Sequence, residues 1–228
     1  MTLNLTRLAG RLWLFPHDPD PSHVQPCSGV VDLGDRSVLV DAGNGPRRGR
    51  EVRAAVASAG LPDVVTIVYT HHHWDHVWGA CAWDVDDIVG HVTGAPLVAE
   101  DAARPWATAY AEQAVRDNPR LSASFSARAL AVPDWSELSI RPPTRTFDDE
   151  LELADGLVVR HVGGGHAPDS SIVDDLDSGV ALLGDCFYTP PLHLRSPDDG
   201  IDEAMVAGLR RLPMTWLVEA HGEPWRLS

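Results

Sequence analysis

The side-chain types that bind transition metals meet in one short run of the sequence, His71-His72-His73-Trp74-Asp75-His76. A catalytic zinc site needs imidazole and carboxylate donors that converge on the ion and leave one position open for water. In extended backbone, residues two apart point to the same side, so His71 and His73 can hold one metal together. Asp75 and His76 lie further along and can reach a second metal. His72 is expected to point away and to have a structural role.

The elements around this run predict how it is positioned. Residues 64–69 form a continuous apolar, β-branched segment that is typical of a buried strand, so the histidines are expected on a loop at a strand end. Other strands are expected at 12–15, 29–33, 37–40, 151–153, 157–161, 172–175, 180–183 and 216–219, with strand-like pieces in 88–99. Helices are expected at 47–59 and 201–212. This order of hairpins and helices favours α/β layers over a purely parallel sheet.

A helical insert is expected at about residues 100–131, because this segment is rich in alanine and is interrupted by Pro105 and Pro119. We expect two or three helices there, forming a lid or a wall of the substrate pocket. Trp74, which lies between two candidate ligands, is expected to line that pocket.

Four further motifs accompany the histidine run, each at the end of an expected strand. They are Val40-Asp41-Ala42-Gly43, the segment Gly163 to Ser170 around His166, Gly184-Asp185, and Ala220-His221-Gly222. In composition and order, these motifs and the run resemble the metallo-β-lactamase superfamily over nearly the whole chain. The resemblance implies a four-layer αββα sandwich formed by residues 1–228 as a single domain.

The resemblance also implies a role for each matching residue. His71, His73 and His166 would hold a first metal; Asp75, His76 and His221 would hold a second; Asp185 would bridge both; Asp41 would fix the ligand loop by hydrogen bonds. Two zinc ions per chain are the expected cofactor because histidine nitrogens dominate, although imidazole also suits iron and manganese.

The implied reaction is hydrolysis of an ester, lactone, thioester or related bond in a small molecule. Two metals roughly 3.5–4 Å apart can share a hydroxide that attacks the substrate, and Asp75 would assist the leaving group. Two alternatives remain open. One is an oxidoreductase resembling the persulfide dioxygenases, with a single iron held by two histidines and an aspartate. The other is a catalytically inactive metal-binding protein.

Differences from known members narrow the substrate. The commonest β-lactamases have a cysteine at the position of Asp185 and a lysine at that of Tyr188, which makes antibiotic hydrolysis doubtful. A tyrosine three residues after the bridging aspartate is similar to the acyl-homoserine lactonases, so Tyr188 is a candidate donor to the substrate carbonyl. The chain is also similar to the glyoxalase II catalytic domain, but it ends seven residues after His221, so we do not expect the C-terminal extension of those enzymes.

Composition limits the expected partners and location. The net charge of −15 repels phosphate backbones, which argues against nucleic acid as a partner. No apolar stretch is long enough to span a membrane, and no signal peptide is evident. Three widely spaced cysteines suit a reducing compartment, so we expect a cytoplasmic protein acting on a small molecule, with its oligomeric state open.

Overall fold

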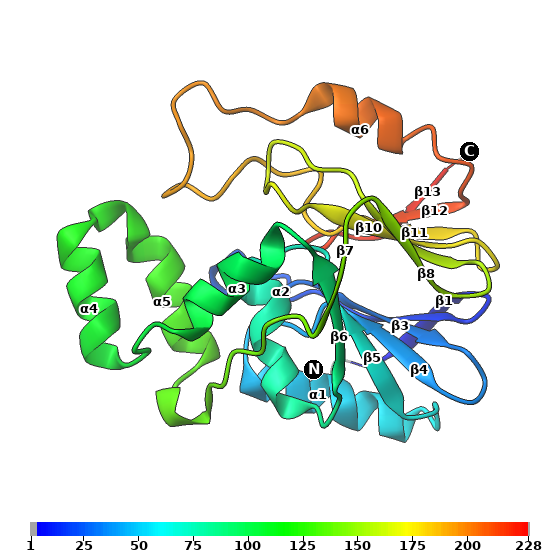
Figure 1. The fold of residues 1–228 in the computed structure, drawn as a ribbon, viewed down its shortest axis with the longest axis horizontal. Helices are drawn as coiled ribbons and strands as arrows, with labels where there is room; N and C mark the ends of the chain where they lie inside the picture. The colour runs from blue at the N-terminus through cyan, green and yellow to red at the C-terminus, as the bar shows by residue number, and fades with distance from the viewer. Residues whose placement is uncertain (1–3, 228) are drawn as a thin grey trace.

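Two mixed β-sheets packed face to face form the centre of the computed structural model, which describes residues 4–227 (Figure 1). The first sheet has the order β1 (Thr6–Ala9), β2 (Leu12–Phe15), β3 (Ser28–Asp32), β4 (Ser37–Val40), β5 (Val64–Val68), β6 (Asp87–His91) and β7 (Arg145–Phe147). The second has the order β13 (Trp225–Arg226), β12 (Trp216–Val218), β11 (Val180–Leu182), β10 (Ser171–Asp175), β9 (Leu157–His161) and β8 (Glu150–Ala154).

Each sheet combines hairpins with parallel pairs. Strands β1 to β4 pair antiparallel, whereas β4, β5, β6 and β7 pair in parallel. In the second sheet β11 pairs in parallel with β12, and the neighbouring pairs are antiparallel.

The helices lie outside the sheets and to one side. They are α1 (Pro46–Ser58), α2 (Trp74–Val77), α3 (Gly94–Ala102), α4 (Thr108–Asp117), α5 (Ser122–Ala131) and α6 (Glu203–Leu209). Short 3-10 turns occupy Pro21–His23, Trp78–Ala82, Pro119–Leu121 and Trp135–Glu137. Within residues 4–227, no helix is both long and apolar enough to cross a bilayer.

Alternating side chains divide the core into layers. In β4, Val38 and Val40 belong to the cluster between the two sheets, while Leu39 belongs to the cluster shared with α1. In β10, Val173 joins the cluster between the sheets, and Ile172 packs in the cluster that includes α6. Because successive residues of a strand face opposite sides, each sheet is covered by its partner and by helices. This arrangement confirms the expected α/β sandwich of helix, sheet, sheet and helix.

The insert differs from expectation in its boundaries. Residues 94–99 were expected as strand-like pieces, but they form the start of α3, and only 88–91 of that stretch belong to β6. A short apolar run fits a strand and a buried helix equally well by periodicity, which explains the error. Pro105 lies between α3 and α4, and Pro119 between α4 and α5, as expected for a residue that interrupts helices. Three short strands, β1, β7 and β13, were not predicted.

The registers bring the ends of several strands to one edge of the sandwich. Val40 pairs with Val68, which places Asp41 beside the histidine run. Leu182 pairs with Val218, which places the loops after β11 and β12 next to each other. The two sheets meet here, since the backbone amide of Ser171 donates to the carbonyl of Thr70 at 2.8 Å.

Candidate metal centre

Three imidazole nitrogens converge in a first group formed by His71, His73 and His166. His71 Nε2 lies 3.0 Å from His73 Nδ1, and His73 Nδ1 lies 2.9 Å from His166 Nε2. His71 and His73 come from the loop after β5, and His166 from the loop between β9 and β10. The structure therefore brings together the three residues predicted for the first metal.

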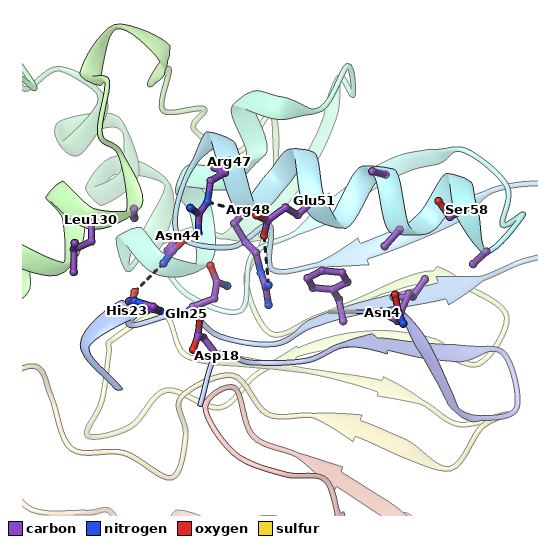
Figure 2. A pocket seen from close by; sticks show the side chains of 16 residues that line it. Asn4, Asp18, His23, Gln25, Asn44, Arg47, Arg48, Glu51, Ser58 and Leu130 are labelled. Carbon is purple, nitrogen blue, oxygen red and sulfur yellow. Dashed lines mark hydrogen bonds and ion pairs between the residues drawn. The ribbon is translucent and has the colours of Figure 1, made fainter. Parts of the chain in front are cut away.

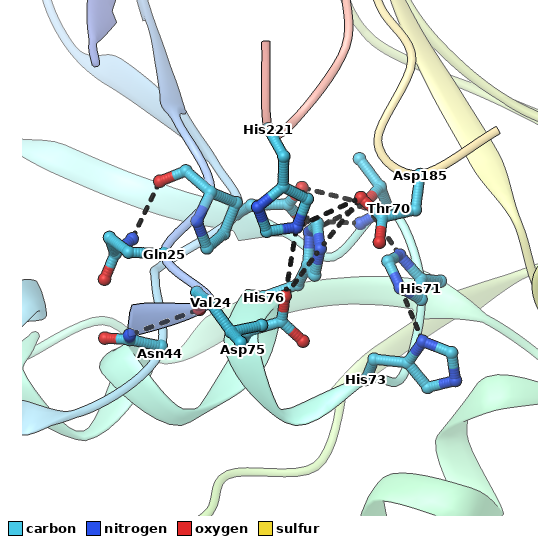
Figure 3. A network of polar contacts seen from close by, with 12 residues as sticks. Val24, Gln25, Asn44, Thr70, His71, His73, Asp75, His76, Asp185 and His221 are labelled. Atoms are coloured by element: carbon cyan, nitrogen blue, oxygen red, sulfur yellow. Dashed lines mark hydrogen bonds and ion pairs between the residues drawn. The ribbon is translucent and has the colours of Figure 1, made fainter. Parts of the chain in front are cut away.

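A second group contains Asp75, His76, Asp185 and His221 (Figure 3). His76 Nε2 and His221 Nε2 lie 3.4 Å and 3.3 Å from Asp75 Oδ2. Asp75 and His76 lie in the single turn of α2, and His221 follows β12. These are the residues predicted for the second metal, together with the predicted bridge.

Asp185 lies between the two groups. Its Oδ2 is 3.2 Å from His166 Nε2 in the first group. Its Oδ1 is 3.4 Å from His76 Nε2 and 3.5 Å from His221 Nε2 in the second group. One carboxylate oxygen thus faces each group, as a bridging ligand requires.

Gly184 allows Asp185 to reach this position. Its φ of +52° is in the left-handed region, which glycine adopts without steric cost. A Cβ on Gly184 would lie 2.6 Å from Thr70 Oγ1, so a larger residue would also press the two loops apart.

Asp41 holds the histidine loop in place through hydrogen bonds. Its Oδ1 accepts from the backbone amide of Thr70 at 2.8 Å, and its Oδ2 accepts from Thr70 Oγ1 at 2.8 Å. His76 Nδ1 lies 2.7 Å from the same Oδ2. Asp41 is 3% exposed, and its φ of +59° is one that aspartate and asparagine tolerate better than most residues. The residue thus occupies the supporting position predicted for it.

These contacts select one proton arrangement for three of the rings. His76 donates from Nδ1 to Asp41, so its Nε2 is left for a metal. His166 donates from Nδ1 to the carbonyl of Thr189 at 3.0 Å. Thr70 Oγ1 donates to Asp41 and can accept from His71 Nδ1 at 3.2 Å. The nitrogen that each ring turns toward its group is then the one that a metal ion would bind.

Charge and burial act differently on the two groups. Burial, followed by the neighbouring imidazoles, lowers the pKa of His71 and of His73 well below the usual value, which favours the neutral, metal-binding form. Burial also acts to lower the pKa of His76, but the nearby Asp41 and Asp75 carboxylates raise it well above 6.5. Burial acts to raise the pKa of Asp75, yet the charges of His76 and His221 hold it well below 3.8.

The donor set fits a pair of metal ions. Zinc–nitrogen bonds of about 2.0–2.1 Å in a tetrahedron separate neighbouring donors by roughly 3.3 Å, close to the separations within both groups. His76 Nε2 and Asp185 Oδ1 are buried and make no hydrogen bond within residues 4–227. Buried polar atoms are rarely left unsatisfied, and an ion between these two would satisfy both.

Tyr188 lies beside the second group. Its ring is 5.7 Å from the His221 ring, edge to face, and its backbone amide donates to the carbonyl of Asp185 at 2.9 Å. Burial and then the negative charge of Glu219 raise the pKa of Tyr188, so its hydroxyl stays protonated and able to donate. The neighbouring Glu219 was not recognised from the sequence, where no motif marks it.

Two residues of the histidine run have other surroundings. His72 points away from both groups and its Nδ1 lies 2.7 Å from Asp169 Oδ1, in agreement with the structural role expected for it. Trp74, which was expected to line the substrate pocket, is 6% exposed, and its ring packs 5.3 Å from that of Trp78. Its large apolar surface accounts for this burial in the core.

A cavity of about 850 Å³ lies elsewhere in the molecule, between the N-terminal strands and α1 (Figure 2). Asp18, His23, Asn44, Arg48 and Glu51 are among the residues that line it. No predicted metal ligand lines this cavity, so the chemistry of the two ligand groups lies outside it.

Comparisons with known proteins agree with this geometry. A probable metallo-hydrolase of Bacillus subtilis (strain 168), YqjP, is 26% identical over 212 residues, which are 84% of this chain and 65% of that protein. The chain thus spans about 65% of the length of this curated relative.

Solved structures of similar fold include a metallo-beta-lactamase from Hirschia baltica, with a TM-score of 0.68 and 16% identity, covering 99% of this chain and 93% of that one. A metallo-beta-lactamase from Pontibacter korlensis has a TM-score of 0.64 and 18% identity, covering 99% and 94%. Identities this low establish the fold and leave the substrate open.

The family model described as the metallo-beta-lactamase superfamily matches residues 22–228. The match includes all five motifs, and the structure places their candidate ligands in two adjoining groups. The chain belongs to the metallo-beta-lactamase superfamily.

Proposed function

We propose that this protein is a zinc-dependent hydrolase with two metal ions per chain, acting on an ester, lactone, thioester or related bond of a small molecule. The observation that carries the proposal is the position of Asp185, whose Oδ2 faces His166 and whose Oδ1 faces His76 and His221. When bound, a pair of metal ions lowers the pKa of water to about 7 and polarises the bond to be cleaved.

The chain's own residues then have separate tasks. Asp185 would hold the two ions at a fixed separation, and Asp41 would keep the His76 ring oriented. Tyr188 would donate a hydrogen bond to the substrate carbonyl oxygen, where charge develops during attack. Asp75, whose carboxylate lies 3.4 Å from His76 Nε2 and 3.3 Å from His221 Nε2, would assist the leaving group.

A small-molecule substrate is consistent with the charge of the chain. The net charge of −15 opposes the approach of nucleic acid, and all 18 basic residues are arginines, so no lysine occupies the position of Tyr188. A β-lactam is therefore not the substrate that we propose.

The experiment that tests the proposal is a substrate screen combined with metal analysis. Zinc-loaded protein is assayed on a panel of esters, thioesters, lactones and phosphodiesters, and its metal content is measured by mass spectrometry. Two zinc ions per chain with turnover of a member of the panel support hydrolysis. One iron per chain with consumption of a persulfide would instead support the dioxygenase alternative, and two zinc ions without any turnover would support a metal-binding protein.

A further inference from the structure

Arg128 of α5 carries a buried guanidinium beside the histidine loop. The residue is 7% exposed, and its Cζ atom lies 4.9 Å from the centre of the Trp74 ring and 5.0 Å from that of Phe125. Trp78 and Trp106 lie 5.5 Å and 5.8 Å away. Aromatic faces partly stabilise such a cation, but they supply no negative charge.

No carboxylate pairs with this guanidinium within residues 4–227. Its hydrogen bond goes to Ser124 Oγ in the same helix, and Nε is buried without an acceptor. Asp101 is the acid that acts on it most strongly, but the two Asp101 oxygens already accept from Trp78 Nε1 at 2.9 Å and from Arg104 Nη1 at 3.1 Å.

An unpaired buried cation is unfavourable, and an anionic ligand bound beside it would offset part of that cost. Burial lowers the pKa of Arg128 to about 10, which leaves the group charged at neutral pH. The charge is therefore present before any ligand binds.

The guanidinium lies against Trp74, which directly precedes the candidate ligand Asp75 in the chain, and its charge also influences the loop of residues 189–200. On one side, the negative charge of Asp75 acts to raise the pKa of Arg128. On the other side, burial and then the charge of Arg128 lower the pKa of His193. Arg120 ties the insert to this loop by donating to the carbonyls of Leu192 and Arg195.

Figure 1 shows α5 and the orange segment before α6 on the same side of the molecule. The carbonyl of Thr189, at the start of this loop, also accepts from His166. The loop of residues 189–200 therefore contacts both the candidate ligand His166 and the insert that carries Arg128.

We propose that Arg128 binds an anionic group of the substrate, a carboxylate or a phosphate, while the bond to be cleaved lies at the metal centre. This inference rests on the proposed hydrolase function and specifies the class of substrate. A guanidinium is the side chain best suited to both groups, because its planar array of donors matches their oxygens. The surrounding tryptophans exclude water and so strengthen the attraction.

Binding to the zinc-loaded chain tests the proposal directly. Phenylacetate is compared with its neutral isostere phenylacetamide, and phenyl phosphate with phenol, by calorimetry. We expect wild-type protein to bind at least one of the two anions at least tenfold more tightly than its neutral partner. The better anion identifies the substrate group as carboxylate or phosphate. Equal affinity for each anion and its neutral partner would overturn the proposal.

Variants separate the role of Arg128 from that of the metal ions, which also attract anions. Arg128→Met should reduce the ratio of anion to neutral affinity at least tenfold, and Arg128→Lys, which keeps the charge, should retain more of it. Arg116→Met is the matched control, because Arg116 is an exposed arginine of the same insert, near Glu112. A loss of thermal stability with an unchanged ratio in Arg128→Met would show a structural role and refute the anion site.

The test also distinguishes failure of this inference from failure of the proposed function. The protein could show an Arg128-dependent preference for anions and yet hydrolyse no member of the panel. That result would support the anion site and refute the hydrolase function. Alternatively, the protein could hydrolyse anionic and neutral esters with equal kcat/KM, and Arg128→Met could leave the ratio of the two values unchanged. That result would support the hydrolase function and refute the anion site.

Discussion

His76 Nδ1 lies 2.7 Å from Asp41 Oδ2, so a residue at the end of β4 determines which nitrogen of a candidate ligand faces the metal centre. Both side chains are almost completely buried. The same Asp41 carboxylate also accepts from the amide and hydroxyl of Thr70, so it connects the start of the histidine loop with the helical turn α2 that carries His76.

Replacing Asp41 with asparagine is therefore expected to weaken metal binding without unfolding the chain. Asparagine tolerates the left-handed backbone at this position, but its amide cannot accept from both Thr70 and His76 at the Oδ2 site. We expect a 10–100-fold loss of zinc affinity, measured by competition with a chelating dye. Asp35→Asn, an exposed change at the hairpin turn before β4, is the control and should bind zinc normally.

Asp185→Asn is expected to weaken the pair of metal sites. An amide has one oxygen, so it cannot present a carboxylate oxygen to each group. We predict that metal content falls below two ions per chain and that turnover falls by orders of magnitude on the best substrate of the panel. Full metal content and full rate would show that Asp185 does not bridge. Asp84→Asn, at an exposed aspartate, should leave both quantities unchanged.

Tyr188→Phe removes a hydroxyl and little else. If this hydroxyl donates to the substrate carbonyl, kcat/KM should fall by up to about 10²–10³, since that is the effect of losing one oxyanion donor. Zinc content, measured on the same preparation, should stay constant. Loss of metal would show that Tyr188 has a structural role or is a metal ligand. An unchanged rate would mean that the similarity to the lactonases does not extend to this residue. Tyr110→Phe in α4 is the matched control.

Metal uptake should depend on pH differently at the two groups. Without metal, the raised pKa of His76 means that its Nε2 keeps a proton at pH values above 6.5, and a metal ion must displace that proton. Affinity at the second group should therefore increase as the pH rises toward this raised pKa. His71 and His73 have lowered pKa values and are neutral near pH 7, so the first group should bind with little pH dependence there.

Calorimetry in buffers of different ionisation enthalpy measures the protons released with each metal ion. One metal should bind near pH 7 with little proton release, and the other with release of protons. Identical release for both ions would contradict the assignment of charges. Dialysis of the loaded protein against a chelator at falling pH should remove the second ion first.

The grouping of the candidate ligands could be predicted from the sequence because each of them lies in a short motif at the end of a strand. His71 and His73 are two residues apart, and this spacing alone places their rings on one side of extended backbone. The hairpin of β3 and β4 was similarly recognisable from apolar runs on both sides of a Gly-Asp turn. Local patterns of this kind can be recognised without knowledge of the tertiary contacts made by the rest of the chain.

Other features of the site depend on contacts between distant segments. Arg128 appears in the sequence as an ordinary arginine in an alanine-rich helix, and only the packing of α5 against Trp74 reveals its burial. Besides burial, the charge of Glu219 raises the pKa of Tyr188, although the two residues are distant in the sequence and no motif relates them. The short strands β1 and β13 were missed for a related reason, since their identity depends on a neighbouring strand to pair with.

Thr70 is the point at which the two sheets and the metal loop meet, through its contacts with Asp41, Ser171 and the close approach of Gly184. Arg128 lies on a separate segment, joined to this junction by side-chain packing. If Arg128 binds the substrate as proposed, mutations in α4 and α5 should alter substrate preference and leave the metal centre unchanged. In a library of variants randomised in these helices, most members should still bind zinc. In a library randomised around Thr70 and Gly184, most members should lose zinc binding. Helices α4 and α5 are therefore the better target for directed evolution of substrate preference.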